Sequence, residues 1–252
     1  MKLYLLTFLN FKTYVLSFCM LKRRFVYTKD NSDPIGNFLL LSPSFYQMLP
    51  ISEIFVSLQG EGPFSGRRAL FIRFFGCNLR CSWCDTKYSY YGKPKVLEDL
   101  DVLDEFIILT GGEPTLYQDI LRNFLTKAKS RGSEILVETN GTVLLKDHFV
   151  DYVDYFSISP KLSNAGVKYR VDVVKKNVEK LKIKEKFYYI KFPVMWEDDL
   201  NEVKKMVEYF GVEKSKVWLQ PINNERIDYW WDIAVREGYN LSIQLHKFVS
   251  KP

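Results

Sequence analysis

Short apolar runs alternate along most of the chain with segments in which apolar residues recur at helical spacing. The runs read as strands and lie at 51–58, 69–75, 106–110, 135–138, 155–159, 187–192, 216–219 and 241–245. The clearest helical patterns lie at 116–130 and 198–210. In the first of them, Ile120, Leu121 and Phe124 fall on one face. This alternation predicts a parallel sheet with right-handed helical crossovers.

Six such strands follow a first, hairpin-like segment, which predicts an α/β fold built as a partial (β/α)6 barrel. Active sites in such barrels lie at the C-terminal ends of the strands. The first crossover is irregular, because residues 86–106 are short and turn-rich around Tyr90-Tyr91-Gly92-Lys93-Pro94. It leaves room for about two helical turns near 96–105, so we expect a truncated helix there.

Residues 1–47 differ from the rest. The stretch 3–21 is largely apolar and is followed by three basic residues, which would suit a membrane anchor. However, Lys12 interrupts it, at a cost of about 2.5 kcal/mol or more in a bilayer. A signal peptide would carry its basic residues before the apolar run. We expect 1–47 to be an extension outside the fold, with an anchor or targeting segment as alternatives, and 48–252 to be the domain.

Composition sets further bounds. The 252 residues are 47% hydrophobic and 26% charged, enough for one sizeable domain. The net charge of +6 is spread without a long basic run or a stripe of stacking aromatics, so we expect no nucleic-acid partner. No cysteine pattern suggests disulfides, which fits the reducing cytoplasm.

Three of the four cysteines, Cys77, Cys81 and Cys84, lie within eight residues. No regular element would turn all three into an apolar core, so the segment reads as a metal-binding loop. A structural zinc ion needs four protein ligands, and Cys19 lies far upstream. Three thiolates suit an iron–sulfur cluster with one open iron. Zinc completed by His148 or His246, and unligated thiols, remain alternatives.

Polar motifs follow the predicted strands, at 111–114, 138–141, 159–161, 220–221 and 246–247, and in series they suggest one converging site. Adjacent Gly111 and Gly112 permit positive φ and close approach of a ligand, and Glu113 could hold an ammonium group. In the turn 58–62, Gln59 and Glu61 offer polar contacts. Ordinary tight turns are the alternative in both places.

Several of these motifs resemble a known family. Cys-x3-Cys-x2-Cys, with Trp83 before the last cysteine, resembles the signature of radical S-adenosylmethionine enzymes, and the glycine pair resembles their element for the methionine amino group. The order Ser-Leu-Gln-Gly-Glu-Gly from Ser57, Phe-Ile-Arg-Phe-Phe-Gly-Cys from Phe71, and Cys-Asp-Thr from Cys84 is similar to the 7-carboxy-7-deazaguanine synthase family. The resemblance runs from about Ile51 to the C-terminus.

The resemblance implies a lyase reaction on the path to queuosine or archaeosine. In that family the open iron of a [4Fe–4S] cluster binds S-adenosylmethionine, and an electron releases a 5′-deoxyadenosyl radical. The radical removes hydrogen from C6 of 6-carboxy-5,6,7,8-tetrahydropterin. The ring contracts to 7-carboxy-7-deazaguanine with loss of ammonia, and magnesium supports the reaction.

The resemblance also assigns residues. Cluster ligands would be Cys77, Cys81 and Cys84. S-adenosylmethionine contacts would be Trp83, Cys84, Asp85, Gly112, Glu113, Ser159, Pro160 and Lys161. Substrate contacts would be Leu58, Gln59, Gly60, Glu61, Arg73, Thr110, His246 and the terminal carboxylate of Pro252. Thr86 would be a magnesium ligand, with a helix cap as the alternative.

By the same resemblance we expect a cytoplasmic homodimer served by a flavodoxin- or ferredoxin-type electron donor. Two other functions compete. A glycyl-radical-enzyme activase shares the cysteine loop but has no need for the turn at Gln59. A non-catalytic iron–sulfur or zinc protein would have no use for the glycine pair.

Overall fold

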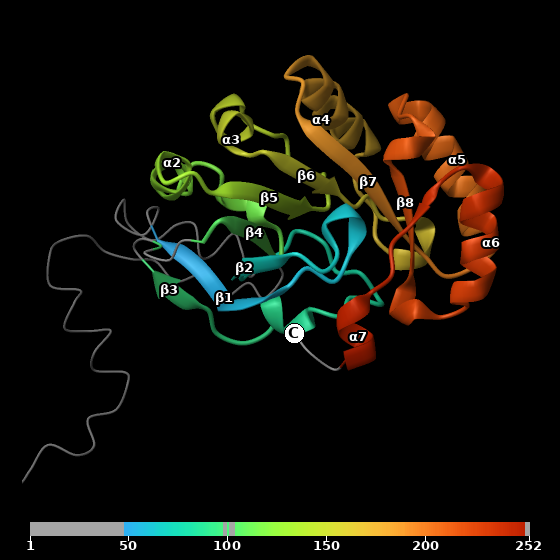
Figure 1. The fold of residues 1–252 in the computed structure, drawn as a ribbon, viewed down its shortest axis with the longest axis horizontal. Helices are drawn as coiled ribbons and strands as arrows, with labels where there is room; N and C mark the ends of the chain where they lie inside the picture. Colours follow the sequence, from blue (N-terminus) through green and yellow to red (C-terminus); the bar gives the residue numbers. More distant parts are fainter. Residues whose placement is uncertain (1–47, 98–99, 101–103, 250–252) are drawn as a thin grey trace, which may run out of the picture. The chain divides into compact units, whose positions relative to one another are not determined.

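The computed structural model describes residues 48–97, 100 and 104–249 (Figure 1). The expected extension 1–47, Cys19 and Pro252 lie outside these residues. Within them, the strands form one sheet of nine in the order β3-β1-β2-β4-β5-β6-β7-β8-β9. The strands are β1 Leu49–Leu58, β2 Arg68–Phe74, β3 Lys95–Leu97, β4 Phe106–Gly111, β5 Glu134–Thr139, β6 Tyr155–Ile158, β7 Phe187–Val194, β8 Val217–Pro221 and β9 Asn240–Leu241.

The sheet is parallel over most of its width. Strand β1 pairs antiparallel with β2 and with β3. Every neighbouring pair from β2 through β9 is parallel. The edge strands β3 and β9 do not pair with each other in the described part of the chain, so the barrel stays open. The predicted partial (β/α) barrel is therefore confirmed.

Helices connect the parallel strands, and Figure 1 shows α2 to α6 ranged along one face of the curved sheet. The α-helices of the described chain are α2 Arg122–Ser130, α3 Asp147–Tyr152, α4 Val171–Ile183, α5 Asp199–Phe210, α6 Ile227–Glu237 and α7 Leu245–Val249. The predicted helix 198–210 is confirmed as α5. The one predicted at 116–130 is divided into a 3-10 turn, Pro114–Tyr117, and α2.

Both faces of the central strands are buried, which explains their unbroken apolar sequences. In β4, Ile107 and Leu109 join the large core beneath the helices. Phe106 and Ile108 point the other way, into a smaller cluster on the opposite face. This alternation is the two-residue period of a strand with apolar partners on either side.

Two local predictions need correction. Residues 95–97, where a truncated helix was expected to begin, form β3 against β1, because Leu49 pairs with Leu97 there. Residues 98–99 and 101–103 are not among those described. The predicted strand 241–245 was also wrong: β9 ends at Leu241, and helix α7 begins at Leu245.

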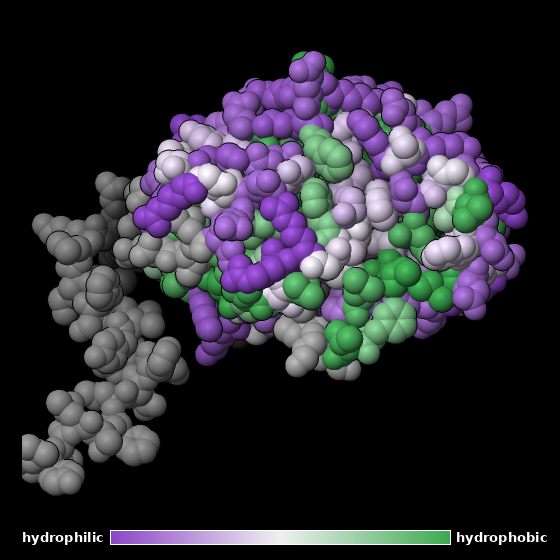
Figure 2. Space-filling view, viewed as in Figure 1, coloured by the Kyte–Doolittle hydropathy of each residue, from purple (hydrophilic) through white to green (hydrophobic). Residues whose placement is uncertain are grey.

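No helix among the described residues is long and apolar enough to cross a membrane. On the face shown in Figure 2, hydrophilic residues cover much of the side along which the helices lie. Apolar residues gather around α7. There Leu245, Phe248 and Val249 are exposed.

Candidate active site

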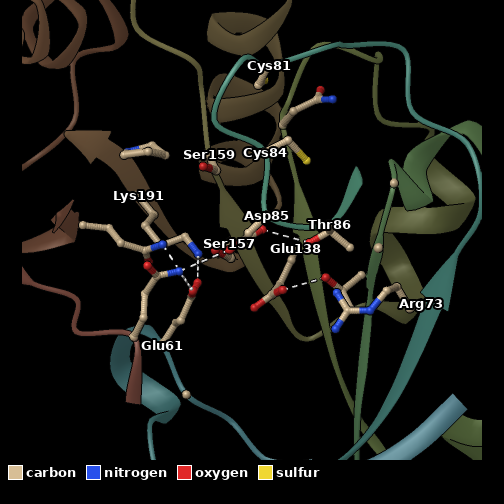
Figure 3. A pocket seen from close by; sticks show the side chains of 18 of the residues that line it. Glu61, Arg73, Cys81, Cys84, Asp85, Thr86, Glu138, Ser157, Ser159 and Lys191 are labelled. Carbon is tan, nitrogen blue, oxygen red and sulfur yellow. Dashed lines mark hydrogen bonds and ion pairs between the residues drawn. The ribbon is translucent and has the colours of Figure 1, made fainter. Parts of the chain in front are cut away.

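The C-terminal ends of the strands surround a cavity of about 440 Å³ (Figure 3). Side chains from the β1–β2 turn, the cysteine loop, the strand ends and α7 line it. The sequence-predicted residues that line it are Leu58, Gln59, Gly60, Glu61, Arg73, Cys77, Cys81, Trp83, Cys84, Asp85, Thr86, Thr110, Gly112, Ser159, Lys161 and His246. Glu113 and Pro160 do not line it. The predicted convergence of strand-end motifs on one cavity is therefore observed.

The three cysteines of the loop are free thiols at one end of the cavity. They pack with Leu79 and Ala165 in a small apolar cluster. Burial, reinforced by nearby Glu113, raises the pKa of Cys77 to about 11, and burial also raises the pKa of Cys81. A bound cation would stabilise the thiolate forms of Cys77 and Cys81, so the donor set suits a metal group.

The geometry also bears on which metal group fits. Among the described residues, no three His, Cys, Asp or Glu side chains converge on a single ion. His148 does not line the cavity and lies beside Asp119, with 3.3 Å between Nε2 and Oδ1. A multi-iron cluster takes its thiolates on separate irons, so they need not converge on one point. His148 lies away from the cysteine loop, whereas His246 lines the same cavity as the three cysteines.

Gly112 brings the end of β4 against the cysteine loop. A Cβ atom there would lie 1.9 Å from the carbonyl oxygen of Gly76. The close approach allows the Glu113 amide to donate to that oxygen at 2.8 Å. Gly111 has φ +109° and could not carry a side chain without strain. The glycine pair is thus required by backbone packing as well as being open to a ligand.

Glu113 lies behind the cavity wall, fully buried. Its carboxylate accepts hydrogen bonds from the amide and hydroxyl of Thr115, the hydroxyl of Thr139 and the amide of Asn140. Burial raises its pKa despite these donors. The carboxylate thus ties the ends of β4 and β5 together, and the expected contact with a ligand ammonium remains a prediction.

A buried ion pair joins the β1–β2 turn to β7. Lys191 donates to Glu61 through Nζ (Figure 3), and Glu61 also accepts from Gln220 at 3.2 Å and Gln244 at 2.9 Å. Burial alone would raise the pKa of Glu61, but the charge of Lys191 and the hydrogen bonds from Lys191 and Gln244 hold it below its usual value. Burial opposes the charged form of Lys191, yet Glu61 and Glu138 raise its pKa.

Lys191, Gln220 and Gln244 all line the cavity. Gln220 belongs to the strand-end motif 220–221, which was expected at the converging site, whereas Lys191 and Gln244 were not predicted as site residues from the sequence. Lys191 offered a signal, because it is the one charged residue within the apolar run 187–194. A charge inside a buried strand needs a partner.

Glu138, at the end of β5, is a further carboxylate at the cavity, from the strand-end motif 138–141, and had no individual role assigned to it. It accepts from Gln59 Nε2 at 2.9 Å and from Thr110 Oγ1 at 2.7 Å. The Glu138 carboxylate thereby links Gln59 and Thr110, which are both predicted substrate contacts. All three side chains line the cavity.

Ser159 and Lys161 follow β6, and Lys161 Nζ donates to Ser159 Oγ at 2.8 Å. Burial lowers the pKa of Lys161. Its ammonium lies 5.6 Å from the centre of the Trp83 ring, and Trp83 Nε1 donates to Asn164 at 3.0 Å. This side of the cavity therefore combines a cation with an aromatic face.

Asp85 and Thr86 follow the last cysteine, and the Thr86 hydroxyl donates to Asp85 Oδ1 at 2.9 Å. Burial alone would raise the pKa of Asp85, but this hydrogen bond and the charges of Lys247 and Lys191 lower it. Two hard oxygen donors thus lie side by side. The alternative of a helix-capping Thr86 is not supported, since its side chain makes no cap hydrogen bond to the 3-10 turn that follows.

Helix α7 closes the cavity beside the β1–β2 turn. The Leu245 amide donates to the Gly60 carbonyl at 3.0 Å, and a Cβ atom on Gly60 would lie 2.6 Å from His246 Nδ1. His246 therefore sits where a glycine leaves room for it.

These features define a class of protein. Residues 71–210 match the family model of the radical SAM superfamily, and the chain belongs to that superfamily. Within it, the chain is 34% identical to the 7-carboxy-7-deazaguanine synthase of Pyrobaculum aerophilum, covering 78% of this chain and 92% of the relative. The same enzyme of Thermoplasma acidophilum is 34% identical, with 79% and 96% covered. The chain belongs to the 7-carboxy-7-deazaguanine synthase family.

A solved structure agrees with this assignment. The crystal structure of QueE from Escherichia coli has a TM-score of 0.63 and 25% identity to this chain. The match covers 82% of this chain and all of the other. The partial barrel is therefore the fold of a known relative.

Proposed function

We propose that this chain is a 7-carboxy-7-deazaguanine synthase. It would convert 6-carboxy-5,6,7,8-tetrahydropterin into 7-carboxy-7-deazaguanine with release of ammonia, supplying a precursor of queuosine or archaeosine. The observation that carries the proposal is that one cavity brings the cysteine loop together with the turn at Gln59, with Arg73 and with Thr110. A glycyl-radical activase would not need this polar turn and arginine beside the cysteines.

Membership of the radical SAM superfamily implies a [4Fe–4S] cluster and S-adenosylmethionine, and Cys77, Cys81 and Cys84 would hold the cluster. When bound, these groups supply a carbon-centred radical that abstracts a substrate hydrogen atom. Glu113 would act from behind the cavity wall, fixing the strand ends that carry Gly112 and Asn140. The cavity-lining residues that would hold S-adenosylmethionine are Trp83, Cys84, Asp85, Gly112, Ser159 and Lys161, and Pro160 stands between the last two in the chain.

The substrate would lie in the part of the cavity that is lined by Arg73, Gln59 and Thr110. Arg73 would pair with its carboxylate, because a guanidinium edge matches a carboxylate in a two-point contact. Gln59 and Thr110, joined through Glu138, would hydrogen-bond the polar edge of the pterin, with Leu58 and Gly60 beside them. His246 would complete the contacts. Glu61, neutralised by Lys191, would mainly shape the turn.

Magnesium would bind at Thr86. A hard cation takes oxygen ligands, and Asp85, ionised at neutral pH because its pKa is lowered, lies next to Thr86. We also infer a homodimer that works in the cytoplasm, where thiols remain reduced. A flavodoxin- or ferredoxin-type protein would supply electrons.

The test is anaerobic reconstitution with iron and sulfide, then incubation with the carboxypterin, S-adenosylmethionine, a reductant, and magnesium present or omitted. We expect the deazaguanine product, formed faster with magnesium. A Cys81→Ala chain is the control and should lose both the visible cluster absorbance and turnover. A reconstituted wild-type cluster that gives no product would contradict the synthase assignment but not the superfamily.

A further inference from the structure

Arg73 reaches the cavity from a strand pair with an irregular register. Arg73 on β2 pairs with Glu53 on β1, and the register shifts between Ile51 and Glu53. Such a bulge re-aims side chains and is common beside active sites. Glu53 Oε1 accepts a hydrogen bond from Arg73 Nε at 2.6 Å. Arg73 lines the cavity and Glu53 does not, so Glu53 holds the arginine from behind.

A tyrosine fixes Glu53 in turn. The Tyr88 hydroxyl donates to the same Oε1 atom at 2.7 Å. Tyr88 lies on the 3-10 turn Lys87–Ser89, directly after Thr86. One carboxylate oxygen thus links β2 to the loop that carries the proposed magnesium ligand.

We propose that Glu53 is a positioning residue that sets the guanidinium of Arg73 for the substrate carboxylate. In the described part of the chain, the hydrogen bond of Arg73 to another side chain uses Nε. The terminal edge, with both Nη atoms, is therefore the one available for a two-point contact with a carboxylate. This role rests on the proposed function, because it requires a substrate with a carboxylate at Arg73.

Geometry and charge predict opposite effects of removing Glu53. If Glu53 acts through its negative charge, it weakens the pull of Arg73 on an anion, and its removal should tighten substrate binding. If it acts by orientation, removal should weaken binding. A glutamine keeps the accepting oxygen without the charge, so it should restore the orientation.

The chain contains a matched control. Glu134 on β5 accepts from Arg67 Nη1 at 2.5 Å and from the Tyr155 hydroxyl at 3.3 Å through one oxygen, Oε2. This is the same combination of glutamate, arginine and tyrosine, but none of the three lines the cavity. A change at Glu134 therefore measures the loss of such a triad without any effect on Arg73.

The experiment measures Kd on the reconstituted enzyme without reductant, so that no turnover occurs. The probes are 6-carboxytetrahydropterin and tetrahydropterin, which lacks the carboxylate. We expect Glu53→Ala to weaken carboxypterin binding by about ten- to a hundredfold and to leave tetrahydropterin binding within about threefold. Glu53→Gln should recover most of the loss, Tyr88→Phe should lose less than Glu53→Ala, and Glu134→Ala should match the wild type.

The outcomes separate this role from the proposed function. A wild-type enzyme that does not distinguish the two pterins overturns the proposed substrate and this role with it. A wild-type enzyme that does distinguish them, combined with unchanged or tighter carboxypterin binding in Glu53→Ala, overturns the positioning role alone. Equal weakening of both pterins would indicate general damage to the cavity and would also overturn it.

Discussion

Individual site residues could be predicted from the sequence where they belong to a short local motif. Cys77 and Gln59 stand in short motifs that follow a strand, and Arg73 was assigned by the family resemblance that these motifs support; the three residues do share a cavity. Lys191 and Gln244 have no such motif. Their contacts with Glu61 join residues 130 and 183 positions apart, and side-chain partners at such separation leave no local pattern.

The buried pair of Lys191 and Glu61 leads to a prediction about stability and pH. In Lys191→Met, Glu61 would be a buried carboxylate without its cation, which should cost about 3–5 kcal/mol of unfolding free energy at pH 7. With Lys191 present, the pKa of Glu61 is lowered from 4.5. The stability from that shift is therefore present above pH 4.5 and is lost as the pH falls through the folded-state value.

Without Lys191, burial is the dominant influence and should raise the pKa of Glu61. Below about pH 4 the carboxyl would be neutral in folded and unfolded variant alike. Urea unfolding at pH 7 and pH 4 should therefore show a large deficit for Lys191→Met that shrinks with acid. Lys146→Met, which removes an exposed pair with Asp119, is the control and should change little. An equal deficit at both pH values would refute this account.

At the scale of elements, the long apolar strands and the helix over 198–210 followed from periodicity alone. The last strand did not, because a tertiary contact ends it. Strand β9 pairs with β8 for two residues, and the Leu245 amide then binds the Gly60 carbonyl instead of continuing the ladder. An apolar run cannot reveal that its backbone partner lies in a distant turn.

The contact between the β4 end and the cysteine loop gives a prediction for Gly112→Ala. The added Cβ would overlap the Gly76 backbone, so the two loops must separate and the bond from the Glu113 amide should break. We expect the variant to bind at most about half the iron of the wild type on reconstitution, a rough estimate based on the sensitivity of metal sites to their supporting contacts.

Gly132→Ala is the control for that variant. Gly132 has φ +81°, and a Cβ atom added to it would meet nothing within 4 Å, so its substitution strains the backbone away from the cavity. It should cost about 1–2 kcal/mol of stability and leave the iron content unchanged. Iron per chain and visible absorbance measure both variants. Full iron loading of Gly112→Ala would show that the loops tolerate separation.

At the scale of the whole molecule, the domain from 48 onward should be self-sufficient. Strand β1 begins at Leu49, which is 1% exposed, and Ile51 is equally buried; both belong to the large core. β1 also pairs with β2 and β3 at once. A chain that starts at Met48 therefore keeps every strand of the sheet as the structure describes it.

We predict that this shortened chain has the urea midpoint, iron content and turnover of the full-length protein. A chain that starts at Ile54 is the matched comparison. It loses the side chains of Leu49 and Ile51, each worth about 2–5 kcal/mol in a packed core, and it loses the residues that pair with β3. Such a loss approaches the total stability of an ordinary domain, so this chain should not fold. If the chain from Met48 failed as well, residues 1–47 would have to be part of the domain, and the boundary predicted from the apolar pattern would be wrong.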